Sequence, residues 1–170
     1  MSEEIINKVA RSPLQTIDLE EFYVSGERIR LDVKDQLFRG MVLREKDFRE
    51  FIKSTNWASF EGKHVAIQCS VDAIVPTWAY MLLSVALKPY AKTILFGTLD
   101  ELEAQLFKTA LDAIDWSKYE NAKVVIKGCS KVNVPIAAYV DVTSRLQPIV
   151  SSIMFGEPCS TVPIFKKSKK

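Results

Sequence analysis

In residues 123–139 the chain reads KVVIKGCSKVNVPIAAY. The apolar start predicts a short buried strand, and Pro135 predicts the first turn of a helix, where the missing proline N–H costs nothing. Cys129 and Ser130 stand in the turn between the two elements. The stretch therefore predicts a strand, a turn and a helix, with a thiol at the carboxyl end of the strand.

A second stretch repeats this pattern earlier in the chain. Residues 56–70, NWASFEGKHVAIQCS, align with residues 115–130, DWSKYENAKVVIKGCS, if one residue is inserted near Asn121. Both copies then continue to Val-Pro and to Pro-x-x-Ala-Tyr, which ends at Tyr80 and Tyr139. Aromatic packing and a proline at the helix start explain part of this likeness, but they do not explain why Cys-Ser recurs. The sequence therefore predicts two strand-turn-helix units that are built alike.

Strands and helices are expected to alternate through most of the chain. The predicted strands are residues 64–69, 93–97, 123–129 and 152–157. The predicted helices are residues 43–55, 76–88, 98–114 and 135–147. Thr98 and Glu101 have the spacing of a capping box at the start of the third helix. Such alternation predicts an α/β fold, with a mostly parallel sheet of four or slightly more strands in the order 2-1-3-4 and helices on both faces.

One domain is the expectation for a chain of 170 residues, of which 48% are hydrophobic. Residues 1–43 are expected to form an extension or flap, with a short helix near 3–10 and an edge strand at 27–33. Residues 44–165 would form the repeated core, and the lysine-rich residues 166–170 a solvated tail.

Charge and hydropathy exclude several classes of protein. The formal net charge is +2 and the lysines are scattered, so no basic face indicates a nucleic-acid partner. No apolar run reaches the roughly eighteen residues that a membrane span needs, and the acidic start MSEEIINKVA is unlike a signal peptide. We therefore expect a cytoplasmic protein without nucleic-acid or membrane partners. A protein partner and the oligomeric state stay open.

The three cysteines share one kind of position. Cys69, Cys129 and Cys159 each precede a serine, at or just beyond the carboxyl end of a predicted strand. Open parallel sheets bind their ligands at this edge, and the order 2-1-3-4 makes the three cysteine-bearing strands neighbours. In a reducing compartment such thiols are metal ligands, redox groups or buried free cysteines. We therefore predict that the three thiolates meet at one zinc ion or iron–sulfur cluster.

Two other functions stay open beside metal binding. One is a thiol-dependent enzyme or sulfur carrier, in which one thiolate is the nucleophile. The other is a binding module whose cysteines only pack. A P-loop, a dinucleotide-binding fingerprint and a C-x-x-C motif are missing from the sequence, and no catalytic residue can be assigned.

A three-cysteine site leaves room for a fourth ligand and for groups that support the ligands. Asp72 and Glu157 lie within three residues of a cysteine and could supply an oxygen, although Asp72 would also suit a turn cap. His64 begins the predicted strand that ends at Cys69, so it lies too far from the cysteines to bind the same metal ion. The candidates for hydrogen-bonding support around the ligands are Ser70, Ser130, Ser160, Tyr80 and Tyr139.

Four motifs resemble an uncharacterised bacterial family, a domain of unknown function, across almost the whole chain. They are LFRGMVLREKDFREF (37–51), CSVDAIVP (69–76), KGCSKVNVPIAAY (127–139) and MFGEPCSTVPIFKK (154–167). In their genomic setting, members of this family resemble neighbours of iron–sulfur cluster assembly genes. The resemblance therefore implies a link to that pathway and supplies no mechanism.

Overall fold

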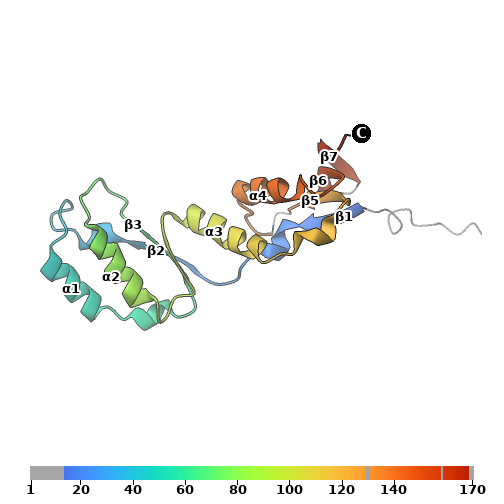
Figure 1. Cartoon of the computed structure of the whole chain (residues 1–170). Coiled ribbons are helices and arrows are strands. Elements are labelled where there is room, and N and C mark those ends of the chain that lie inside the picture. The colour runs from blue at the N-terminus through green and yellow to red at the C-terminus, as the bar shows by residue number, and fades with distance from the viewer. Residues whose placement is uncertain (1–13, 129–130, 158, 169–170) are drawn as a thin grey trace, which may run out of the picture. The chain divides into compact units, whose positions relative to one another are not determined.

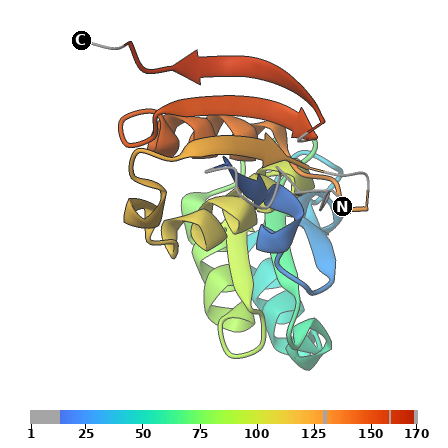
Figure 2. The same cartoon turned by 90° about the vertical axis from the view of Figure 1, so that its right-hand side faces the viewer.

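The computed structural model describes residues 14–128, 131–157 and 159–168. The chain divides into two compact units, which Figures 1 and 2 show from two directions. Unit 2 is the continuous segment 25–105, whereas unit 1 combines residues 1–24 with residues 106–170. The second division falls inside helix α3 (Leu99–Asp112). Each unit is described below by itself.

Unit 2 contains a parallel sheet in the order β2-β3-β4 (Figure 1). Its strands are β2 (Arg28–Asp32), β3 (His64–Gln68) and β4 (Thr93–Phe96). Its helices are α1 (Glu45–Ser54), α2 (Thr77–Leu87) and the short 3-10 helices η2 (Val33–Gln36) and η3 (Trp57–Phe60). Phe48 of α1 and Leu83 of α2 pack with Val65 and Ile67 of β3 in one apolar cluster. Burial of these side chains fixes α1 and α2 on one face of the sheet.

Unit 1 contains a second sheet in the order β1-β5-β6-β7. Its strands are β1 (Leu14–Asp18), β5 (Lys123–Lys127), β6 (Ser152–Glu157) and β7 (Ser160–Lys166), and only β7 runs antiparallel to its neighbour. Its other helices are η1 (Leu19–Phe22), η4 (Trp116–Tyr119) and α4 (Ile136–Leu146). Figure 2 shows β5, β6 and β7 side by side with α4 behind them. Val142 of α4 packs with Val124, Ile126 and Ile153 of the sheet.

The two units repeat the same construction. In each, a strand ending in aspartate (β1 or β2) pairs in parallel with a central strand (β5 or β3). A tryptophan before each central strand donates its indole N–H to a carbonyl five residues earlier: Trp57 to Ile52 at 2.7 Å and Trp116 to Leu111 at 3.1 Å. The likeness predicted from the sequence is therefore present in the fold, and it extends to the N-terminal strands.

The sequence alignment of the two repeats placed one extra residue near Asn121, and the structure places it elsewhere. Gly62 and Asn121 both have positive φ, 70° and 57°, and both stand two residues before their central strand. No insertion is therefore needed near Asn121. The shift comes after the strand, so that Gly128 occupies the position of Cys69 and Cys129 follows one residue later.

Most predicted elements are confirmed, but the predicted strand order is wrong. The four helices lie within the predicted ranges, and Thr98 and Glu101 form the capping box, with each residue's side chain accepting the other's amide at 3.2 and 2.7 Å. Strand 64–69, however, has no hydrogen bond to strand 123–129, because the N-terminal strands β2 and β1 take the neighbouring positions. The fold is thus a mixed α/β fold with two mostly parallel sheets where one was predicted. Within the described ranges, no helix is long and apolar enough to cross a membrane.

Candidate functional site

Cys69 lies in the turn that follows the central strand of unit 2. Its side chain is half-buried, and the thiol donates a weak hydrogen bond to the carbonyl of Val71 at 3.5 Å. The next residue, Ser70, donates its amide to Oδ1 of Asp32 at 3.1 Å. Because Asp32 ends the neighbouring strand β2, this bond holds the Cys-Ser turn against the carboxyl edge of the sheet.

Asp32 carries a buried negative charge beside this turn. Its side chain is only 5% exposed, and Oδ1 also accepts the amide of Lys34 at 3.1 Å as the cap of η2. Burial acts to raise the pKa of Asp32, but the hydrogen bonds from Ser70 and Lys34 outweigh it and hold the pKa below its usual value. The carboxylate is therefore ionised at neutral pH.

Tyr80 comes from the first turn of α2 and lies near both groups. Its ring packs edge-on against Phe96 of β4, with centroids 5.0 Å apart. Burial, followed by the charges of Cys69 and Asp32, raises the pKa of the Tyr80 hydroxyl. The hydroxyl is thus protonated at neutral pH, and its supporting role beside metal ligands stays a prediction.

Unit 1 presents a related edge with different charges. Asp18 ends β1 as Asp32 ends β2, and its Oδ1 accepts the amide of Glu20 at 3.1 Å. Its Oδ2 forms an ion pair with the ammonium of Lys127 at 3.1 Å. Glu20 in turn accepts the amide of Lys131 at 3.1 Å. Cys129 and Ser130 themselves lie outside the described residues.

Tyr139 of α4 covers Gly128 in unit 1. A Cβ atom at Gly128 would collide with the Tyr139 hydroxyl, so Tyr139 would have to shift to admit a cysteine like the one at the equivalent position in unit 2. The Tyr139 ring packs edge-on against the Phe155 ring, with centroids 5.8 Å apart, as the Tyr80 ring does against Phe96. The tyrosine and phenylalanine are therefore shared by the two units, and the residue below the tyrosine differs.

Cys159 lies in the turn between β6 and β7. The flanking residues Glu157 and Ser160 face each other in the antiparallel register, and all three side chains are exposed. Cys159 therefore follows the carboxyl end of its strand, as predicted, and its thiol is open to solvent.

An apolar pocket of about 270 Å³ lies beside Tyr139 in unit 1. Helix α4 and three strands line it, through Ile126, Ile136, Tyr139, Thr143, Phe155 and Ile164. The sequence analysis missed this pocket, because its lining residues come from four separate elements and share no motif. Its shape suits a small apolar group.

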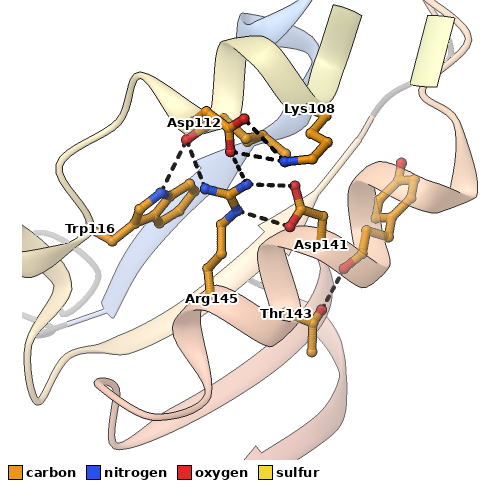
Figure 3. Close-up of polar contacts among 8 residues, drawn as sticks. Lys108, Asp112, Trp116, Asp141, Thr143 and Arg145 are labelled. Carbon is orange, nitrogen blue, oxygen red and sulfur yellow. Dashed lines mark hydrogen bonds and ion pairs between the residues drawn. The ribbon is translucent and has the colours of Figure 1, made fainter. Parts of the chain in front are cut away.

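Charged side chains connect α3 to α4 on another side of unit 1 (Figure 3). The Arg145 guanidinium donates to Asp141 at 2.9 and 3.0 Å and also to Asp112, which pairs with Lys108 at 3.1 Å. Hydrogen bonds from Arg145 and Lys108 lower the pKa of Asp112. Every charge in this cluster has an opposite partner, which indicates a structural role.

The predicted metal site lies only partly within the described residues, because Cys129 is outside them. No three His, Cys, Asp or Glu side chains among them form a metal-binding group. Cys69 belongs to unit 2, whereas Cys159 belongs to unit 1. Asp72 is exposed, and its predicted ligand role stays a prediction.

The only histidine is engaged elsewhere, as expected. Nδ1 of His64 lies 3.0 Å from Oγ1 of Thr93, and Nε2 lies 3.0 Å from the carbonyl oxygen of Ser25. Both ring nitrogens of this buried residue are therefore occupied at the amino end of β3.

The sequence analysis also missed Asp18 and Asp32. A signal was present: in both N-terminal strands the aspartate is followed by an apolar residue, Leu19 or Val33, that is fully buried. An aspartate that ends an alternating strand and precedes such a residue is a candidate cap for the following turn.

Comparison with known proteins identifies the family and nothing finer. No curated protein and no solved structure matches the chain. One family profile, described as "Protein of unknown function (DUF2480)", matches residues 3–167. The chain therefore belongs to the DUF2480 family.

Proposed function

We propose that the protein binds a zinc ion or an iron–sulfur cluster through the thiolates of Cys69, Cys129 and Cys159. It would act in the cytoplasm as a carrier or accessory factor in metal or iron–sulfur handling. One observation carries the proposal: the described cysteines lie at the ligand-binding edges of their sheets and outside the fully buried cores. Free cysteines that serve only packing are usually among the most buried residues.

The chemistry of the two described thiols supports metal exchange. Cys69 is half-buried and Cys159 is exposed, so an ion could reach both from solvent. Thiolates are the preferred ligands of zinc and of iron in clusters. A reducing cytoplasm would keep the thiols free for this role.

Metal analysis of anaerobically purified protein tests the proposal, together with the absorbance spectrum that separates zinc from an iron–sulfur cluster. We expect near-stoichiometric metal in the natural protein and a large loss in Cys69→Ser, Cys129→Ser and Cys159→Ser. Val85→Ser, which changes an exposed residue of α2, serves as the control and should keep its metal. Trace metal alone in the natural protein would rule the function out.

The pattern among the three variants defines the site further. Equal losses in all three would mean that the thiols act together. Retention of metal in Cys69→Ser, with loss in the other two, would mean that Cys69 acts separately.

A second candidate is a thiol-dependent enzyme or sulfur carrier. The exposure of Cys159 in a hairpin turn favours it, because thiol exchange requires access. Alkylation of metal-free protein, read by mass spectrometry, tests this candidate. Fast labelling confined to one cysteine would favour thiol chemistry, whereas slow labelling of all three would oppose it.

A third candidate is a binding module whose cysteines are structural. The apolar pocket beside Tyr139 favours it. An apolar fluorescent probe should then bind the natural protein and fail to bind Ile136→Asp, which places a charge at the pocket wall. Equal fluorescence with both proteins would exclude the pocket as the binding site.

A further inference from the structure

Asp32 is buried without using all of its capacity to accept hydrogen bonds. Its Oδ1 atom accepts the amides of Lys34 and Ser70, each at 3.1 Å. Its Oδ2 atom is buried and accepts no hydrogen bond. The Lys34 ammonium, whose side chain is 42% exposed, forms an ion pair with Oδ2 at 3.8 Å, too long for a hydrogen bond. A buried carboxylate oxygen of this kind points to a donor or cation that completes it.

The equivalent aspartate in unit 1 shows what completes such an oxygen. Oδ2 of Asp18 pairs with the ammonium of Lys127, which stands opposite it in the sheet register. In unit 2 the residue opposite Asp32 is Gln68, which has no charge. Unit 2 therefore keeps the carboxylate and lacks the cation in the place where unit 1 has one.

The incomplete carboxylate lies next to a cysteine. Ser70, whose amide binds Oδ1, directly follows Cys69 in the chain. Tyr80, in the first turn of α2, packs edge-on against Phe96 of β4 in the same unit. The Cys69 thiol and the Asp32 carboxylate therefore lie at the same carboxyl edge of unit 2, linked through the Ser70 amide.

We propose that Asp32 Oδ2 and Cys69 Sγ bind one divalent metal cation of the zinc type at the carboxyl edge of unit 2. Zinc accepts both thiolate and carboxylate ligands, and two protein ligands leave coordination positions for water or further groups. The inference rests on the proposed function and makes Asp32 the oxygen ligand that the sequence suggested at Asp72 or Glu157. The Tyr80 hydroxyl is a hydrogen-bond donor to the bound ligands.

Cobalt titration of the full-length chain tests this site, after removal of metal with a chelator under reducing, anaerobic conditions. Cobalt(II) bound to a thiolate gives a charge-transfer absorbance, and competition by zinc then gives the zinc affinity. Asp32→Asn removes the charge and keeps the shape of the cap, and Gln68→Lys supplies the ammonium that unit 1 has. Asp72→Asn and Asp18→Asn are the matched controls, and circular dichroism checks that all four fold.

We expect Asp32→Asn and Gln68→Lys to weaken zinc binding by on the order of 10- to 100-fold or more, and the two controls to bind as the natural chain does. Metal-free Gln68→Lys should also melt at a higher temperature than the metal-free natural chain, because its ammonium completes Asp32. Zinc affinity that falls in Gln68→Lys and not in Asp32→Asn would mean that the new ammonium repels the ion and that Asp32 is purely structural.

The outcomes separate this inference from the proposed function. Unchanged affinity in Asp32→Asn, together with loss of the absorbance in Cys69→Ser, would overturn the role of Asp32 and leave metal binding standing. Weak binding in Asp72→Asn alone would move the oxygen ligand to Asp72. No cobalt or zinc binding by the natural chain would overturn this inference and the zinc form of the proposed function, and would leave the iron–sulfur form to the metal analysis above.

Discussion

Units 1 and 2 have the same framework and different chemistry at the carboxyl edge. Both have a capping aspartate at the end of the first strand and a tyrosine packed on a phenylalanine of the third strand. In unit 1, Lys127 forms an ion pair with Asp18, and Gly128 lies against the hydroxyl of Tyr139. Unit 2 has Gln68 and Cys69 at these positions. The comparison teaches that a repeated scaffold can keep its packing while it changes charge and thiol content at the edge.

Matched core truncations test the shared framework and should have the largest effect. Leu87 and Leu146 end α2 and α4, and both are fully buried. Replacing either by alanine should lower the free energy of unfolding by about 2–5 kcal/mol, because each leaves a cavity in its own core. Urea denaturation followed by circular dichroism measures both variants. A loss below about 1 kcal/mol in either would show that its unit does not depend on this packing.

Gly128→Ala tests the main difference between the units. The new Cβ would collide with the Tyr139 hydroxyl, so we expect a loss of about 1–3 kcal/mol in the free energy of unfolding. Tyr139→Phe removes the hydroxyl, and the double variant should recover most of this loss. Cys69→Ala at the equivalent position is the control, since that site already holds a Cβ atom. If the double variant is no more stable than Gly128→Ala, the collision is not the cause.

Tryptophan replacements compare the two indole hydrogen bonds. Trp57→Phe and Trp116→Phe each remove one N–H donor to a helix carbonyl and should cost about 0.5–1.5 kcal/mol for that bond. Trp57 should cost more in total, because it is buried and Trp116 is only partly so. Thermal melting monitored by circular dichroism ranks the two. The reverse ranking would mean that the charges around Trp116 matter more than its burial.

Removal of Arg145 should give the smallest loss of stability, which is present at neutral pH and disappears in acid. Its hydrogen bond is the first cause of the lowered pKa of Asp112. A lowered folded-state pKa stabilises the fold above the unfolded value, near 3.8, and this stabilisation is lost as the pH falls through the folded value. Arg145→Gln should therefore raise the Asp112 pKa toward 3.8, measured by NMR titration of the carboxyl. An unchanged pKa would assign the shift to Lys108 instead.

Element positions could be predicted from the sequence because local patterns determine them. The apolar runs, the helix-start prolines and the capping box at Thr98 gave boundaries close to those observed. The grouping of strands into two sheets could not be predicted in this way. It depends on β1 and β2, short strands from a segment with weak periodicity, which pair with strands far along the chain.

The candidate site was predictable in part. The positions of Cys69 and Cys159 just after their strands followed from chain order. The importance of Asp32 could not be seen, because it depends on which residue stands opposite in the register. Gln68 and Lys127 look equivalent in the repeat, and only pairing with an aspartate shows that one supplies a charge and the other does not.

The strand order also has a consequence for synthesis on the ribosome. Unit 2 is one continuous segment, so all of its strands are available once residue 105 has been made. Strand β1 is made before unit 2, yet its partner β5 begins only at Lys123. At about 5–20 residues per second, β1 stays unpaired for several seconds or more while unit 2 is completed after it.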